Sequence, residues 1–159
     1  MICWRIATET RQYRANDLSG KGAASNPGRW NSEGETVVYA AEHRSLAVLE
    51  TAAHLDSDAF PMNRFLVEID IPDELWAQRE TTDPATLSPA WAAIPFGMAS
   101  VEHGSAWWRS QRSLILLVPS VIVPEEQVVL IHAEHPDAAR VTAKTVRPFA
   151  YDRLFRGGR

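Results

Sequence analysis

A continuous apolar run, SLILLV at residues 113–118, places the strongest constraint on the fold. Leucine, isoleucine and valine follow one another without a charged side chain, which is typical of a strand buried on both faces of a sheet. Pro119 and Ser120 come directly after the run and predict its end. The run therefore predicts a central strand.

Five further segments show strand patterns. Residues 64–71 alternate, so we expect a strand with one buried face: Phe65, Val67, Ile69 and Ile71 lie on that side, and Leu66, Glu68 and Asp70 lie on the other. The other strands are expected at 3–6, 36–41, 127–131 and 142–151.

Two segments are expected to be helices, at residues 45–55 and 98–109. Ser45 is a suitable N-cap for the first, and Leu46, Leu49 and Ala53 follow at helical spacing. Gly104 weakens the pattern of the second, and the residues after Pro72 predict one short helical turn. Residues 8–34 form a polar segment rich in Gly, Ser and Asn, in which NPGRWNSEG predicts a turn-dense loop, and the Pro-, Thr- and Ala-rich residues 81–97 are expected to be irregular. The mixed order of elements indicates an α+β fold in a single domain, residues 1–159.

Composition excludes several classes of function. The formal net charge is −4, and no cluster of Lys and Arg forms a basic stripe, so we expect no direct binding to nucleic acid. Cys3 is the sole cysteine, which excludes an intrachain disulfide and fits a reducing compartment. No leader pattern or membrane-length apolar run is visible, so we expect a cytoplasmic protein that does not enter a membrane.

The sequence lacks the common motifs for metals and nucleotides. Its five histidines do not fall at metal-binding spacings, and neither a P-loop nor a dinucleotide-binding glycine motif occurs. Ser120 follows a buried strand but lacks the G-x-S-x-G pattern of a hydrolase nucleophile, so a turn-capping role is the alternative. We expect no metal site.

Glu50 is the most unusual residue in the expected helices. It shares a helix face with Leu46 and Leu49, where a carboxylate is unfavourable unless it is paired or hydrogen-bonded. A structural pair with His54, four residues on, is one interpretation. A role in a functional site is the other, because perturbed carboxylates gather at such sites.

Two arginines and two aromatic residues stand at positions where a ligand site is an alternative to an ordinary structural role. Arg29 follows a glycine in a turn-dense loop and is suited to bind a diphosphate, or else it forms a surface ion pair. Trp30 next to it either contacts a ligand ring or fills the core. Arg5, inside an apolar strand, either protects a sheet edge or faces a cleft. Tyr39 is expected in the core unless it lines a site.

Several stretches together resemble the RES domain family, which is named for an Arg, a Glu and a Ser. They are CWRIA, then GRWNSEGETVVYAAEHRSLAVLETAAHL, FLVEIDIP and SLILLVPSVIVPEEQVVLIHAEHPDA, and they cover most of the chain. The resemblance implies a fold like that of ADP-ribosyltransferases, with a split mixed β core and flanking helices. It also implies a toxin that consumes NAD+ as substrate, without a prosthetic group, and whose partner is an antitoxin of the Xre helix-turn-helix type.

The resemblance also implies roles for individual residues. Glu50 matches the catalytic glutamate, Arg29 the arginine that contacts phosphate, and Tyr39 the aromatic residue near the nicotinamide ribose. Arg5, Trp30 and Ser120 are expected to contact the substrate. The chain departs from the family pattern at His132-Ala133, where Asn-Pro is usual, and at Gln127, where Asn is frequent.

The expected reaction is cleavage of the bond between nicotinamide and ribose in NAD+. A carboxylate beside the ribose stabilises the positive charge that develops as this bond breaks. Water, phosphate or a protein side chain then accepts the ADP-ribose, and the sequence does not select among them. Two alternatives remain open: a partner-binding module in which Arg29 and Glu50 form a structural ion pair, and a toxin that cuts RNA.

Overall fold

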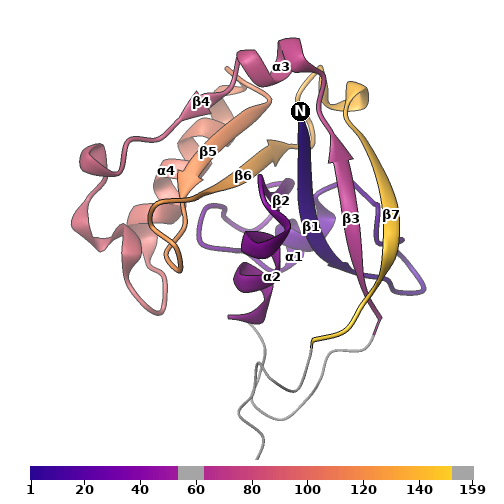
Figure 1. Ribbon diagram of the computed structural model, residues 1–159. Helices are drawn as coiled ribbons and strands as arrows, with labels where there is room; N and C mark the ends of the chain where they lie inside the picture. Colours follow the sequence, from indigo (N-terminus) through magenta and orange to yellow (C-terminus); the bar gives the residue numbers. More distant parts are fainter. Residues whose placement is uncertain (54–62, 152–159) are drawn as a thin grey trace, which may run out of the picture.

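The structure is a computed structural model, and it describes residues 1–53 and 63–151. Within these residues one sheet has seven strands in the order β4-β5-β6-β2-β1-β3-β7 (Figure 1). Every neighbouring pair is antiparallel except β4 and β5, which are parallel. The strands are β1 Ile2–Thr8, β2 Val37–Ala41, β3 Arg64–Asp70, β4 Glu80–Thr81, β5 Ile115–Pro119, β6 Gln127–His132 and β7 Thr142–Phe149.

The sheet is nearly divided between β1 and β2. These two strands share a single registered pair, Trp4 with Ala41, whereas β1 pairs with β3 along its whole length. One half of the sheet is therefore β4-β5-β6-β2 and the other is β1-β3-β7, and the two halves diverge beyond the shared pair. This arrangement confirms the expected α+β fold with a split mixed sheet.

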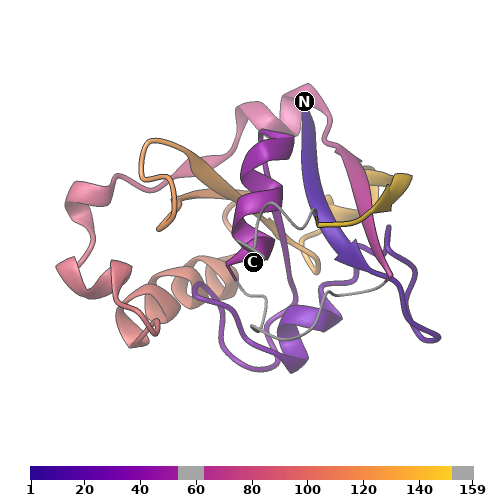
Figure 2. The ribbon, with the colours of Figure 1, turned by 60° about the horizontal axis from the view of Figure 1, so that its bottom comes forward.

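Helices cover the two halves of the sheet separately (Figure 2). α2, Arg44–Ala52, packs through Leu46 and Ala47 on Trp4 and Ile6 of β1. α4, Met98–Ser110, packs through Trp107 in a core with residues of β2, β5 and β6. The remaining helices are short: α1 Lys21–Ser25, α3 Asp73–Ala77, and the 3₁₀ turns η1 Pro84–Thr86, η2 Pro89–Ala92 and η3 Ala138–Arg140. No helix of the described residues is both long and apolar enough to cross a membrane.

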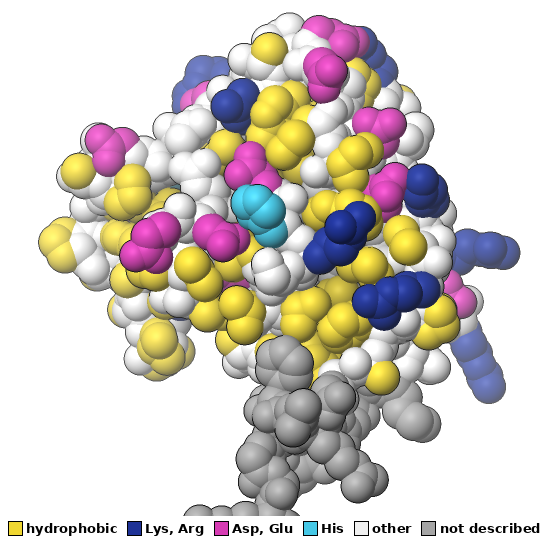
Figure 3. All heavy atoms as spheres, viewed as in Figure 1, with side chains coloured by type: hydrophobic (Ala, Val, Ile, Leu, Met, Phe, Trp, Pro, Cys, Tyr) yellow, Lys and Arg dark blue, Asp and Glu magenta, His cyan; other side chains and the backbone are white. Residues whose placement is uncertain are grey.

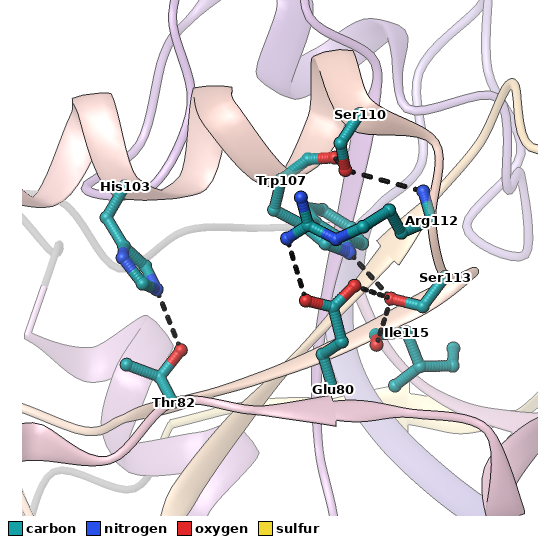
Figure 4. A network of polar contacts seen from close by, with 8 residues as sticks. All are labelled: Glu80, Thr82, His103, Trp107, Ser110, Arg112, Ser113 and Ile115. Carbon is teal, nitrogen blue, oxygen red and sulfur yellow. Dashed lines mark hydrogen bonds and ion pairs between the residues drawn. The ribbon is translucent and has the colours of Figure 1, made fainter.

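β5 carries the apolar run and is buried at every position, as the sequence predicts. It is the second strand from the edge, because the two-residue strand β4 lies outside it. A polar network ties β4 to the end of α4 (Figure 4): the Ser113 hydroxyl donates to Glu80 Oε1 at 2.8 Å and accepts from Trp107 Nε1 at 2.9 Å, while Arg112 pairs with Glu80 Oε2 at 2.9 Å.

Three expectations about local structure were wrong. α2 begins at Arg44 and its N-cap is His43, so Ser45 lies inside the helix and does not cap it. The polar segment 8–34, in which no helix was expected, contains α1. Leu66 of β3 is buried on the face that was expected to be exposed, because α2 and Tyr151 belong to the core on that side. His54, the alternative partner of Glu50, lies outside the described residues.

Candidate active site

A cavity of about 550 Å³ opens where the two halves of the sheet diverge. Ligand-binding cavities commonly have volumes of this order. Its walls come from β1, α1, β2, α2 and the segments before α4 and after β5. All six residues that the sequence predicts for a site line this one cavity: Arg5, Arg29, Trp30, Tyr39, Glu50 and Ser120.

Glu50 and Ser120 form the closest polar contact in the cavity. The Ser120 hydroxyl donates to Glu50 Oε1 at 2.5 Å, although α2 and the end of β5 are 70 residues apart in the chain. Glu50 Oε2 has no hydrogen-bond partner within the described part of the chain. The carboxylate is therefore held through one oxygen, and the other is available to a ligand.

The backbone after β5 fixes the direction of the Ser120 hydroxyl. Ser120 is only 1% exposed, and its Oγ accepts hydrogen bonds from the backbone N–H groups of Ile122 at 3.1 Å and Val123 at 3.0 Å. Because two donors already point at the oxygen, its single proton is directed toward Glu50. The turn-capping role and the contact with Glu50 are thus fulfilled by the same hydroxyl.

Arg29 uses one nitrogen to hold the segment before α4. Its Nη1 donates to the carbonyls of Trp91 at 2.7 Å and Ala93 at 2.9 Å. Partial burial lowers the pKa of its guanidinium, and the charge of Glu50 offsets part of that effect. Within the described residues its other nitrogens have no hydrogen-bond partner, and no ion pair joins Arg29 to Glu50. The described residues therefore lack the Arg29–Glu50 ion pair that a purely structural role for these two residues would require.

Arg5 places a second guanidinium on the cavity wall. β1 is an inner strand, so protection of a sheet edge does not explain this residue. Its Nη1 donates to the backbone carbonyl of Asp17 at 3.2 Å, and no carboxylate of the described residues forms an ion pair with it. Burial lowers its pKa, and the nearby charge of Asp17 opposes the effect. A partly buried cation of this kind favours an anionic ligand.

Tyr39 is fixed by the loop that precedes β2. Its hydroxyl donates to Asn31 Oδ1 at 2.8 Å and accepts from the Trp30 N–H at 3.1 Å, and burial raises its pKa. A Cβ added to Gly28 would lie 2.8 Å from the Tyr39 hydroxyl, so glycine is needed there for contact with the tyrosine. The phenol is neutral at physiological pH, and its ring is a wall of the cavity.

Trp30 mainly fills the core. The side chain is 2% exposed, and its ring stacks on Trp91 with centroids 5.9 Å apart and meets His103 edge to face at 6.0 Å. It lines the cavity, but its burial and its ring contacts fit core packing better than the stacking of a ligand ring. The sequence left both interpretations open.

A buried carboxylate that the sequence analysis missed stabilises the loop carrying Arg29. Glu35 Oε2 accepts from the Ser32 N–H at 2.7 Å and from the Ser105 hydroxyl of α4 at 2.6 Å, and Arg109 lies 3.6 Å from its other oxygen. Next to Ser105, a Cβ on Gly104 would come within 1.9 Å of the Trp30 carbonyl oxygen. Helix α4 therefore contacts the loop backbone directly at this glycine.

The departure from the family pattern at His132-Ala133 lies outside the cavity lining, whereas the departure at Gln127 pairs with Pro119, which lines the cavity. His132 is fully buried at the end of β6, and neither it nor Ala133 lines the cavity. Its Nδ1 accepts from the Glu134 N–H at 3.2 Å, so Nε2 carries the proton and donates to the Trp108 carbonyl at 2.9 Å. Among the described residues, no three His, Cys, Asp or Glu side chains lie close enough to hold a metal ion.

Comparison with known proteins identifies the family. The RES domain matches residues 2–152. The chain belongs to the RES domain family. A relative from Sphingobium sp. (strain YBL2), named Prs ADP-ribosylating toxin, is 53% identical over 149 residues, which are 94% of this chain and 92% of the relative.

More distant RES proteins agree with this assignment. A protein from Yersinia enterocolitica named Toxin Res is 34% identical over 155 residues, covering 96% of this chain and 97% of its own length. Among solved structures, a chain of the M. tuberculosis MbcT–MbcA toxin–antitoxin complex superposes with a TM-score of 0.62. Its sequence is 18% identical, and the match covers 98% of this chain and 86% of that one, so it supports the fold.

Proposed function

We propose that this RES protein is a bacterial toxin that breaks the bond between nicotinamide and ribose in NAD+. The observation that carries the proposal is the hydrogen-bonded Glu50–Ser120 pair in the same cavity as Arg29 and Arg5. A dinucleotide needs both features, because it combines a diphosphate with a glycosidic bond whose cleavage leaves positive charge on the ribose.

Cleavage of this bond depends on stabilisation of the positive charge on the ribose, and the leaving nicotinamide does not need a proton. As the C1′–N bond breaks, its electron pair goes to the pyridinium nitrogen, and nicotinamide leaves as a neutral molecule. Charge then develops on the ribose ring, as in other glycosyl transfers. Glu50 is the catalytic carboxylate in this proposal: Ser120 holds Oε1, and Oε2 accepts from a ribose hydroxyl or faces the developing charge.

The arginines account for binding of the diphosphate. Arg29 has nitrogens that make no contact with the described protein groups, and a planar guanidinium binds phosphate oxygens in pairs. Arg5 adds a second positive charge from β1. Tyr39 forms an apolar wall beside the ribose and limits the access of water to the reacting carbon.

We favour a protein acceptor for the ADP-ribose. The Sphingobium relative at 53% identity is named for ADP-ribosylation and for Prs, so a Prs protein is the first acceptor to test. In that reaction an acceptor side chain attacks C1′ and loses a proton. Water and inorganic phosphate are the other acceptors that the same intermediate would take.

An antitoxin is the expected protein partner. The solved relative comes from a toxin–antitoxin complex, and an antitoxin of the Xre helix-turn-helix type fits the resemblance of this sequence. The location that suits the reaction is the cytoplasm, where NAD+ is held. No prosthetic group has a part in the mechanism.

Product analysis with antitoxin-free protein tests the proposal. Purified protein is incubated with NAD+ alone, with phosphate, and with purified Prs, and nicotinamide, ADP-ribose and modified Prs are measured by chromatography and mass spectrometry. Nicotinamide should appear, and the co-product should identify the acceptor. A parallel sample of total RNA should stay intact, because on the face drawn in Figure 3 the side chains of Asp and Glu are interspersed among those of Lys and Arg. Loss of RNA without release of nicotinamide would favour a nuclease, and loss of neither would favour a partner-binding module.

A further inference from the structure

An apolar rim borders the cavity just before α4. Ile94 is 84% exposed and Phe96 is 38% exposed, yet both line the cavity together with Pro95. Large apolar side chains at a cavity mouth indicate contact with a ligand or partner, since exposure to water is unfavourable for them. The mechanism proposed above gives them no role.

Arg29 determines where this rim lies. It bonds the carbonyls of Trp91 and Ala93, and its Cζ is 5.8 Å from the centre of the Phe96 ring. A diphosphate bound by Arg29 would therefore lie next to the aromatic ring. The half of a dinucleotide beyond the diphosphate would meet the rim.

The proposed function already assigns a place in the cavity to the nicotinamide end of NAD+. Glu50 and Ser120 belong to α2 and β5, and they take the ribose that carries nicotinamide. A dinucleotide bound with its diphosphate at Arg29 then has its adenosine as the remaining part. Of the exposed surfaces near Arg29, the flat apolar ring of Phe96 is suited to stack on a purine.

We propose that Phe96 binds the adenine ring of NAD+ and so determines the preference for a dinucleotide over a mononucleotide. This proposal rests on the proposed function for the identity of the substrate. Stacking of one base on an aromatic side chain changes affinity by roughly 10-fold or more. Ile94 and Pro95 extend the apolar contact.

Binding of two half-substrates separates this proposal from its alternatives. ADP carries the adenine, and nicotinamide mononucleotide carries the other ring. Their affinities are measured by calorimetry on protein in which Glu50→Gln prevents turnover, with and without Phe96→Ala. We expect Phe96→Ala to lower the affinity for ADP by roughly 10-fold and to leave the affinity for the mononucleotide unchanged. Phe96→Tyr should restore ADP binding, and Met98→Ala, at a more exposed residue outside the cavity lining, should change neither affinity.

Four results would overturn the proposal: no binding of ADP to the parent protein, an unchanged affinity for ADP in Phe96→Ala, an equal loss of affinity for both ligands, or a loss of affinity for the mononucleotide alone. The last would assign the ring to nicotinamide. Turnover of NAD+ is a separate measurement, so failure of wild-type protein to release nicotinamide would count against the proposed function, while the ADP result would still decide the role of Phe96.

Discussion

The hydroxyl of Ser120 donates to the carboxylate of Glu50 at 2.5 Å, across the cavity between the end of β5 and helix α2. Ser120→Ala removes that bond and leaves the N–H groups of Ile122 and Val123 without their acceptor. Because the carboxylate loses its orientation, we predict that kcat falls by roughly 100-fold, with a smaller change in KM. Steady-state release of nicotinamide measures both constants.

A matched serine provides the control for this prediction. Ser113, which follows α4, also belongs to a hydrogen-bonded network (Figure 4). Unlike Ser120, it does not line the cavity. Ser113→Ala should destabilise the fold and leave the kcat of the folded protein near wild type. Equal kcat values for Ser120→Ala and wild type would show that the hydrogen bond does not position Glu50 for catalysis.

Arg29→Lys should weaken substrate binding although it keeps the charge. A lysine ammonium cannot hold the carbonyls of Trp91 and Ala93 and at the same time present a second planar edge to a diphosphate. We predict a KM for NAD+ that is raised by roughly 10- to 100-fold, on the scale of a lost charge-assisted hydrogen-bond pair. Arg112→Lys, at the pair with Glu80, is the control. An unchanged KM for Arg29→Lys would contradict the assigned role.

Gly104→Ala should damage both the fold and the site. The new Cβ would lie 1.9 Å from the Trp30 carbonyl oxygen, so α4 and the loop carrying Arg29 must move apart. We predict a loss of about 1–3 kcal/mol of stability, with reduced activity in the fraction that folds. Gly22→Ala in α1 is the matched control, because its Cβ meets nothing within 4 Å. Chemical denaturation compares the two, and similar midpoints would refute the contact.

The protein should lose stability in mild acid through His132. Burial lowers the pKa of this histidine, which is neutral in the fold. Below the ordinary histidine pKa of 6.5, the unfolded chain therefore binds more protons than the native protein. The contribution of neutral His132 to the unfolding free energy is fully present above pH 6.5 and is lost as the pH falls through the lower pKa of the native state. His103 is shifted in the same direction by burial.

His132→Asn isolates this contribution. The variant is expected to be less stable at every pH because it loses stacking on Trp108. Between pH 7.5 and 5.5, however, its unfolding free energy should change less steeply with pH than that of wild type. Because one titrating group is removed, the two slopes should differ by up to about 1.4 kcal/mol per pH unit. Denaturation curves at several pH values give the slopes, and parallel slopes would exclude His132 as the titrating group.

The sequence anticipates the lining of the cavity where a polar side chain conflicts with the pattern of its neighbours. Glu50 conflicts with an apolar helix face, Arg5 with an apolar strand, and Ser120 marks the end of a buried strand; each lines the cavity. The apolar run and the alternating segment likewise correspond to β5 and β3. In these cases a residue and its immediate neighbours in the sequence are enough to predict its role or its strand.

The remaining parts depend on contacts between distant segments. Phe96 reaches the cavity because Arg29 bonds a segment more than 60 residues away, and nothing in the Pro- and Ala-rich composition there indicates this. Gly104 was expected to weaken a helix, yet close packing on the Trp30 backbone explains it. Leu66 is buried because of where α2 lies, which the alternation within one strand cannot show.

The most direct test of the central claim compares nicotinamide release by three forms of the antitoxin-free protein: wild type, Glu50→Gln, and Glu42→Gln, whose side chain does not line the cavity. Wild type and Glu42→Gln should release nicotinamide from NAD+ at similar rates, and Glu50→Gln should be slower by roughly 100-fold or more, with an unchanged melting temperature. Equal rates for Glu50→Gln and wild type would contradict a catalytic role for this carboxylate.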